Sequence, residues 1–260
     1  MCLILFSYMN HPDYRLIIAA NRDEFYNRPT QPLDFWTDLP DILGGRDGQS
    51  LGTWLGINRN GKFAAITNFR APSMVKAQAP SRGLLVSDYL QGDTGPLDYL
   101  ETIRKKGLNY NGFNLLAGDS HGLYYYSNMG QHVTSIKSGT YGLSNAFLGT
   151  PWPKVEKGKR EFAKIVSSGR DIPTEPLFDL LKDSRCPRDE DLPETGVGIE
   201  WERLLAPMFI NSETYGTRSS ALVLVDSFNR VTFMERTYLK KRSGDIDHET
   251  RTFQIHTFKE

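Results

Sequence analysis

Cys2 directly follows the initiator methionine and begins the apolar run Leu3–Phe6. Removal of Met1 would leave a thiol and a free α-amine on the first residue of a strand. A thiolate is the reactive form of cysteine, and an α-amine with a pKa of about 7.7–8.0 can serve as the adjacent base that such a nucleophile needs. This position predicts an N-terminal nucleophile. The alternative is that Cys2 is only a small apolar residue at the start of a buried strand.

Four consecutive polar residues, Asn21, Arg22, Asp23 and Glu24, follow the apolar run 16–20 without an intervening turn residue. In an extended chain the side chains alternate, so Asn21 and Asp23 are expected on one face and Arg22 and Glu24 on the other. A hairpin between the first two strands would bring this tetrapeptide close to Cys2, where Asp23 can hold the liberated ammonium group. The alternative is a solvated turn that carries a helix cap or a surface ion pair.

Two asparagines and an arginine are further candidates for a site that handles an acyl group. A thiolate that attacks an acyl carbon creates an oxyanion, which preorganised amide donors stabilise. Asn68 and Asn145 each end an apolar segment, although asparagine is also a common turn residue. Arg218 precedes a strongly apolar strand, so it can face a thiolate or a substrate carboxylate, or lie at the rim as a surface charge.

The composition excludes several classes of protein. Lys and Arg total 31, as do Asp and Glu, so no net charge favours nucleic acid or an anionic membrane surface. The only two cysteines, Cys2 and Cys186, do not make a disulfide framework, and no paired-ligand spacing indicates a metal site. The short apolar N-terminal run predicts neither a signal peptide nor a membrane span. We therefore expect a cytoplasmic protein with a single domain over residues 1–260.

The hydrophobic pattern predicts strands at both ends of the chain around two central helical blocks, an arrangement compatible with two antiparallel sheets between helical layers. Residues 21–41 are too irregular for a helix, Asn60-Gly61 predicts a tight hairpin turn, and residues 183–195 read as an exposed loop. Helices are expected at 84–90, 96–106, 153–167 and 176–181. Strands are expected at 3–8, 14–20, 54–58, 62–67, 113–117, 123–127, 133–136, 221–225, 231–235 and 252–258.

Ordered motifs along nearly the whole chain resemble the NRDE proteins, also called the transport and Golgi organisation protein family. This resemblance implies the α+β, four-layer αββα sandwich of N-terminal nucleophile hydrolases, and it connects the chain with haem trafficking and with lipid or acyl-thioester metabolism. The motifs are Cys2, Ala19–Pro29, Gly52–Ile57, Thr67-Asn68, Ser81–Gly83, Asn111–Leu115, Tyr141–Ala146, Thr150–Lys154 and Tyr215–Arg218.

A more distant resemblance is to the cysteine acylases that cleave conjugated bile salts and penicillin V. Residues 56–69 resemble their segment G-I-N-x-x-G-x-x-A-x-x-N-F, with one residue more between Gly61 and the asparagine, which implies an oxyanion role for Asn68; their second asparagine corresponds to Asn145. Their motif R-N-x-D aligns with residues 20–23, which implies that Asp23 orients the nucleophile. The arginine slot holds Ala20, and alternation points Arg22 to the opposite face. The charge beside the thiolate is therefore expected from elsewhere, with Arg218 as the candidate, or not at all.

These observations lead to one hypothesis and one rival. The hypothesis is a hydrolase that cleaves an amide or thioester of a small hydrophobic acyl substrate without a cofactor or metal. Its catalytic residues would be Cys2, Asp23, Asn68, Asn145 and Arg218, with Asn21, Arg22, Glu24 and Arg70 in substrate-binding or structural roles. The rival is a carrier of haem or lipid that uses the same pocket, with a histidine or the Cys2 thiolate as haem ligand. Neither hypothesis identifies a protein partner. A purely structural or scaffolding role is disfavoured because polar residues recur at several strand ends around one candidate site.

Overall fold

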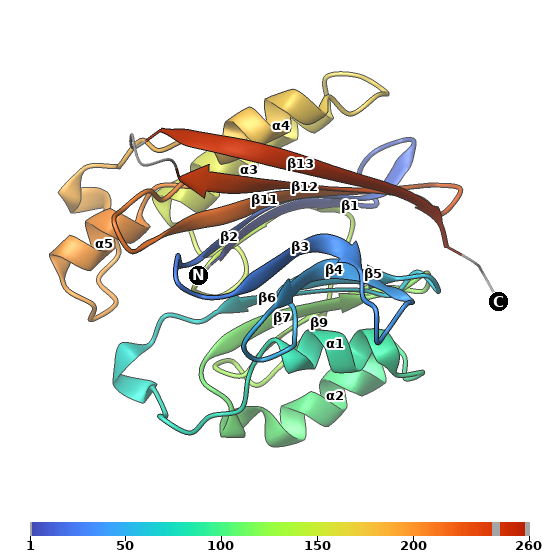
Figure 1. Cartoon of the computed structure of the whole chain (residues 1–260), viewed down its shortest axis with the longest axis horizontal. Helices are drawn as coiled ribbons and strands as arrows, with labels where there is room; N and C mark the ends of the chain where they lie inside the picture. Colours follow the sequence, from blue (N-terminus) through green and yellow to red (C-terminus); the bar gives the residue numbers. More distant parts are fainter. Residues whose placement is uncertain (1, 241–244, 258–260) are drawn as a thin grey trace. The chain divides into compact units, whose positions relative to one another are not determined.

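A computed structural model describes residues 2–240 and 245–257. The chain forms two compact units, and it passes between them several times (Figure 1). The first unit comprises Met1–Asn27, Ser138–Ser144 and Leu148–Gln254; the second comprises Arg28–Lys137, Asn145–Phe147 and Ile255–Glu260. The expectation of one domain over 1–260 stays a prediction.

The first unit is built on a six-stranded sheet with the order β10-β1-β2-β11-β12-β13. The adjacent strands β1 and β2 both lie inside this sheet, and their successive apolar residues are buried, as their sequences predict. The helices α3 and α4 pack on one face, where Leu3, Leu5, Ile17, Phe162 and Phe178 form the core. The elements are β1 (Cys2–Tyr8), β2 (Tyr14–Phe25), β10 (Gly139–Leu143), α3 (Pro153–Val166), α4 (Thr174–Leu181), α5 (Ile199–Leu205), β11 (Tyr215–Asp226), β12 (Arg230–Lys240) and β13 (Ile246–His256).

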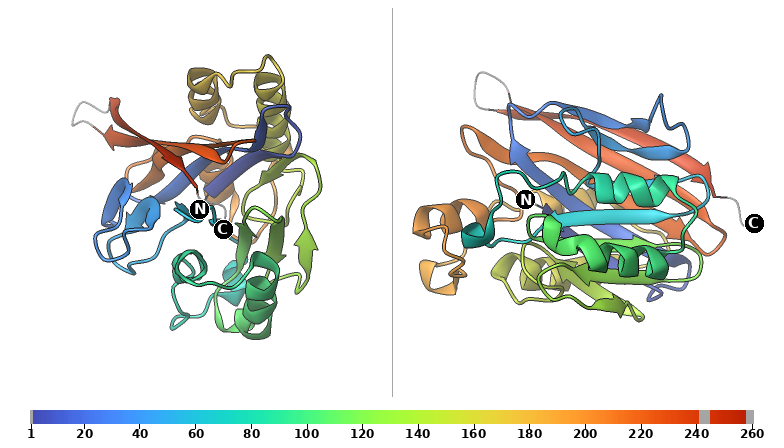
Figure 2. Two further views of the ribbon diagram at one scale, coloured as in Figure 1. Left: turned by 90° about the vertical axis from the view of Figure 1, so that its right-hand side faces the viewer. Right: turned by 90° about the horizontal axis from the view of Figure 1, so that it is seen from below.

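The second unit is a seven-stranded antiparallel sheet in which neighbours in sequence are neighbours in space, from β3 to β9. The helices α1 and α2 cover one of its faces (Figure 2), where Leu85, Tyr89, Leu100, Ile103 and Phe113 are buried together. The elements are β3 (Thr30–Phe35), β4 (Ile42–Asp47), β5 (Leu55–Asn58), β6 (Phe63–Asn68), α1 (Leu84–Gln91), α2 (Pro96–Lys106), β7 (Phe113–Gly118), β8 (Leu123–Ser127) and β9 (Val133–Ser135).

Several expectations about the elements need correction. Residues 21–41 contain no helix, as predicted, but the strand expected at 14–20 continues as β2 to Phe25, and β3 covers Thr30–Phe35. Pro32 is tolerated in β3 because this strand ends the order of its sheet and its pairing with β4 is irregular around the proline. The Asn60-Gly61 turn has a positive φ only at Gly61, so only the glycine is needed there for its conformation. The strand predicted at 252–258 begins earlier, at Ile246, and residue 258 lies outside the described residues.

Two glycines from separate motifs meet in the second unit. A Cβ atom on Gly52 would lie 2.6 Å from the carbonyl oxygen of Gly83, which directly precedes α1. The same carbonyl accepts a hydrogen bond from the backbone N–H of Thr53 at 3.2 Å. The close approach of the two backbones therefore requires glycine at position 52.

We expect Gly52→Ala to lower the free energy of unfolding by about 1–3 kcal/mol, because backbone atoms rather than a flexible side chain must move. Chemical denaturation measures this change. The matched control is Gly169→Ala, since a Cβ at Gly169 would meet only the carbonyl oxygen of Asp171, at 4.0 Å, and the residue lies outside the helices. This control is expected to stay within about 0.5 kcal/mol of the parent. Equal losses for both variants would contradict the close-approach explanation.

Candidate active site

Cys2 is the first residue of β1 and is buried, with 9% of its surface exposed. The hairpin expected between the first two strands is confirmed, and it pairs Cys2 directly with Arg22. On the other side of β2, Arg22 pairs with Ser219 of β11. Cys2, Arg22 and Ser219 therefore form one row across three adjacent strands. Since directly paired residues share a face of the sheet, all three side chains lie on the same face.

The alternation predicted for residues 21–24 holds because β2 is extended through all four of them. Asn21 lies on the face that α3 and α4 cover, and its amide nitrogen donates to the carbonyls of Leu181 and Met208, both at 2.8 Å. Arg22 lies on the opposite face. That face is also the face of Cys2, so the expectation that the charge beside the thiolate must come from elsewhere is wrong.

Burial dominates the electrostatics of Cys2 and raises the pKa of its thiol. The positive charge at the amino terminus and that of Arg22 act in the opposite direction, as does a hydrogen bond from the backbone N–H of Asp23. The carbonyl of Cys2 accepts a hydrogen bond from the Ser144 hydroxyl at 3.2 Å, which fixes the backbone at this end of β1. The thiol is thus enclosed, with two positive charges and one amide donor that favour its ionised form.

Asp23 is buried on the face opposite to the thiol. Its Oδ1 accepts a hydrogen bond from the Thr217 hydroxyl at 2.7 Å, and Thr217 is its partner in β11. Burial raises the pKa of Asp23, while the amino terminus, the Lys154 ammonium, the Thr217 hydroxyl and Arg22 act against that shift. Lys154 is itself buried and donates to the carbonyl of Leu205 at 2.8 Å. Thr217 and Lys154 both lie within motifs of the sequence, but the sequence assigned neither of them a role.

Arg218 occupies a bulge in β11, between the residues that pair with Asp23 and Arg22. Its guanidinium donates to the carbonyl of Phe25 at 3.0 Å. Partial burial lowers the pKa of Arg218, and the charge of Arg22 acts in the same direction. Glu24 accepts a hydrogen bond from the N–H of Phe25 at 2.9 Å and is half-buried. Arg218 therefore joins the end of β2 rather than the row that contains the thiol.

The second unit brings together Asn68, Arg70 and Asn145. The Asn145 side chain is fully buried, and its Nδ2 donates to the carbonyl of Asn68 at 2.8 Å. The backbone N–H of Arg70 donates to the carbonyl of Asn145 at 2.7 Å. Asn68 ends β6, as predicted, and is half-buried. The two asparagines with implied oxyanion roles are thus linked to each other.

A buried network that sequence reasoning missed holds the segment Asn145–Phe147. The amide nitrogen of Asn114 donates to the Thr67 hydroxyl at 3.0 Å and to the carbonyl of Ala146 at 2.9 Å, and its oxygen accepts from the Tyr125 hydroxyl at 2.7 Å. Asn114 and Thr67 belong to motifs noted in the sequence, but an asparagine in mid-strand gave no signal of this positioning role.

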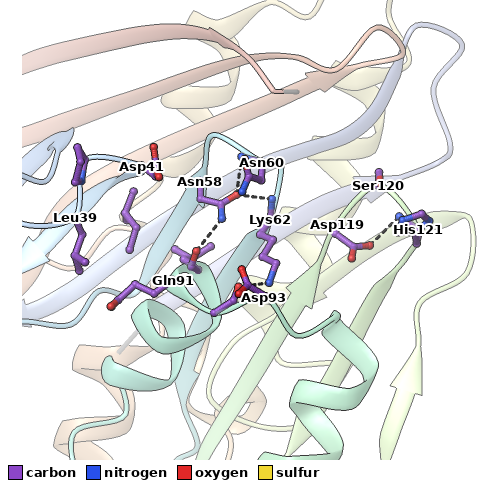
Figure 3. Close-up of a pocket in the computed structure, with 14 residues that line it drawn as sticks. Leu39, Asp41, Asn58, Asn60, Lys62, Gln91, Asp93, Asp119, Ser120 and His121 are labelled. Carbon is purple, nitrogen blue, oxygen red and sulfur yellow. Dashed lines mark hydrogen bonds between the residues drawn. The ribbon is translucent and has the colours of Figure 1, made fainter. Parts of the chain in front are cut away.

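A pocket of about 630 Å³ lies within the second unit (Figure 3). Asn58 and Lys62 both reach the end of α1 in it: the Asn58 amide donates to the carbonyl of Leu90 at 2.7 Å, and Lys62 donates to the carbonyls of Gly92 and Thr94. The contacts to Leu90 and Gly92 satisfy carbonyls at the end of the helix, and the contact to Thr94 holds the loop that follows it. None of the predicted site residues lines the pocket, whose lining is Leu39–Ile42, Asn58, Asn60, Lys62, Leu90–Asp93 and Asp119–His121.

Within 2–240 and 245–257, no group of three or more His, Cys, Asp or Glu side chains is placed to hold a metal ion. Over the same part of the chain, no helix has the length and apolar character needed to cross a membrane.

The fold is similar to that of N-terminal nucleophile acylases. A variant of conjugated bile acid hydrolase from Clostridium perfringens matches with a TM-score of 0.51 at 10% identity, over 97% of both chains. The Caenorhabditis elegans ortholog of N-acylethanolamine-hydrolyzing acid amidase matches with a TM-score of 0.50 at 9% identity, over 86% of this chain and 92% of that one. The α+β sandwich of the N-terminal nucleophile type is thereby confirmed.

Proteins related by sequence match this chain at higher identity, and the matches cover most of both chains. The Transport and Golgi organization protein 2 homolog of Homo sapiens is 39% identical over 98% of this chain and 99% of its own, and the Mus musculus homolog is 38% identical with the same coverage. The Drosophila melanogaster protein is 31% identical over 91% of this chain and 92% of its own. The family model described as Transport and Golgi organisation 2 matches residues 1–240. The chain therefore belongs to the Transport and Golgi organisation 2 family, as its motifs predicted.

Proposed function

We propose that this protein is an N-terminal-cysteine hydrolase that cleaves an amide or thioester of a small hydrophobic acyl substrate. The observation that carries the proposal is the environment of Cys2, a buried thiol at the start of β1 that receives the backbone N–H of Asp23 and shares its row with Arg22. A thiol kept only as apolar filling has no need of an amide donor or of a buried cation on its own face.

The reaction needs only the groups of this chain and water. After removal of Met1, the α-amine of Cys2 accepts the thiol proton, and the thiolate attacks the acyl carbon. The tetrahedral oxyanion is assigned to Asn68 and Asn145, following the resemblance to the acylases. The α-ammonium then returns its proton to the leaving amine or thiol as the bond to the acyl carbon breaks. Water attacks the resulting thioester, which releases the acid and restores the thiol.

A hydrophobic acyl group suits the surroundings of the thiol. The next row on the same face consists of Ile4, Ala20 and Ala221, which are paired across the three strands and buried. Apolar side chains there favour the alkyl part of a substrate over a charged part. The two structural neighbours are named as an N-acylethanolamine-hydrolyzing amidase and a conjugated bile acid hydrolase, so amide conjugates of hydrophobic acids are the first substrates to test.

The test begins with the intact mass of the tag-free protein. We expect the mass of a chain without Met1, which lies outside the described residues. The protein is then incubated with a panel of fatty-acyl thioesters and N-acyl amides, and product release is followed by mass spectrometry. Hydrolysis of at least one class supports the proposal. Retention of Met1 in essentially all molecules would overturn it, because the base would be locked in a peptide bond; stoichiometric haem or lipid binding without turnover would favour the carrier.

A further inference from the structure

The row that contains the thiol also contains a buried cation. Cys2 and Arg22 are direct partners in an antiparallel ladder, and Arg22 is 5% exposed. The Cβ atoms of such a pair lie about 4.5–5.5 Å apart on the same face of the sheet. A positive charge and a thiolate attract each other more strongly in a buried site than in water.

We propose that the positive charge of Arg22 stabilises the Cys2 thiolate. In the acylase motif R-N-x-D the arginine stands two residues earlier in the strand, at the position that Ala20 occupies in this chain. The inference rests on the proposed function. Arg22 transfers no proton: the thiol proton passes to the α-amine, and Arg22 holds the sulfur anion until it attacks.

Arg218, the other arginine considered, is placed less well for this role. Its guanidinium bonds the carbonyl of Phe25, which is three residues farther along β2 than Arg22. At about 3.3 Å per residue this is roughly 10 Å beyond the row of the thiol. Arg218 therefore lies beside the end of the strand, where it can meet the distal part of a substrate.

The other charged groups around the thiol are the Asp23 carboxyl, which raises the pKa of Cys2 from the opposite face, and the amino terminus, which lowers it. Beyond Arg22 in the row, the Ser219 hydroxyl donates to the buried Glu235 carboxylate of β12 at 3.1 Å. Glu235 shares the face of Cys2 because it pairs with Ala221. Glu235 thus lies on the face of the thiol but three strands away from it, in β12, whereas Arg22 is on the strand directly beside Cys2.

The experiment measures thiolate formation, so it does not depend on finding a substrate. In a Cys186→Ser background Cys2 is the only thiol, and its alkylation by iodoacetamide is followed by intact mass from pH 5 to 10. We expect Arg22→Gln to move the alkylation profile to higher pH and to slow the reaction roughly tenfold at pH 7, the effect of about one pKa unit. Arg22→Lys is expected to recover most of the rate. Arg15→Gln, at the other end of β2, is the matched control and keeps the parent profile.

Thermal melts show whether Arg22→Gln folds. If it does not fold, Arg218→Gln still tests the assignment. Under the proposal Arg218→Gln alkylates like the parent. A tenfold loss in Arg218→Gln, or a folded Arg22→Gln whose profile overlays that of the parent, would overturn the assignment. A chain that hydrolyses no substrate but alkylates as expected would contradict the proposed function and leave the role of Arg22 intact.

Discussion

Replacement of Cys2 by alanine is expected to reduce hydrolysis to background, with a loss on the order of 10⁶-fold where the parent rate allows it to be measured. The reason is that no other described group in its row can form the acyl intermediate, since the partners there are an arginine and a serine that is bonded to Glu235. Initial rates with the best acyl substrate measure the effect. Intact mass should show an acyl adduct on the parent and none on Cys2→Ala.

The matched control for this prediction is Cys186→Ser. Cys186 is exposed, and its sulfur contacts only the carbonyl of Arg203, at 3.6 Å, among the hydrogen bonds of the described residues. Its replacement is expected to leave the rate within about twofold of the parent, since surface substitutions of this kind have small effects. Turnover by Cys2→Ala at the parent rate would show that the thiol is not the nucleophile, and it would leave ligand binding as the better account of the site.

The local features of the site were predictable because they depend on neighbours in sequence. Asn10–Asp13 indicated the turn between β1 and β2, and the alternation along residues 21–24 follows directly from an extended chain. The α-helices α1 to α4 were expected within two residues of their bounds because each carries a clear apolar stripe. The family motifs then supplied the fold that alternation alone left open.

The face of Arg22 relative to the thiol was not predictable in the same way. Alternation sorts the residues of one strand into two sets, but it does not say which set shares a face with Cys2. That depends on the register between β1 and β2, and a slip of one residue would exchange the two sets. The pairs Ser7–Ile17 and Cys2–Arg22 fix this register in the folded sheet.

The elements that sequence reasoning missed have weak local signals. β10 contains two glycines in five residues, and α5 has only seven residues, without a side-chain cap. Thr217 became visible as the partner of Asp23 only through β11, which also carries the bulge at Arg218. Bulges and long-range pairs depend on tertiary packing, so a single sequence does not specify where they fall.

Asp23→Asn is expected to separate stability from activity. The carboxyl is buried, and burial raises its pKa above the value of an exposed aspartate even though Lys154 and Thr217 act against the shift. The folded protein thus binds this proton more tightly than the unfolded chain does. In the unfolded chain this carboxyl has a pKa of about 3.9. The free energy of unfolding therefore falls as the pH rises from that value through the higher pKa of the folded state, and it stays at the lower level at higher pH. Asparagine has the same shape and keeps an acceptor for the Thr217 hydroxyl, but it has no such titration.

Chemical denaturation at a series of pH values from 4 to 8 measures this difference. We expect the stability of Asp23→Asn relative to the parent to increase with pH over that window and then to level off. Thr217→Val removes the donor to Asp23 and the acceptor for the N–H of Ile210, so it should lose about 1–3 kcal/mol. This loss should grow as the pH rises, in contrast to Asp23→Asn, because the hydroxyl favours the ionised carboxylate. A constant loss of stability in Asp23→Asn from pH 4 to 8 would show instead that the ionised carboxylate holds the fold together.

The same variant is expected to lose activity, by about 10²-fold or more, because a neutral amide cannot hold the α-ammonium that forms when Cys2 gives up its proton. Hydrolysis rates are measured at pH values where both proteins are folded, so that the loss is not a loss of structure. A stable but inactive Asp23→Asn would mean that burial of this carboxylate opposes folding and is retained for the reaction. An Asp23→Asn variant that is both stable and fully active would remove Asp23 from the mechanism and assign its position beside Thr217 to packing alone.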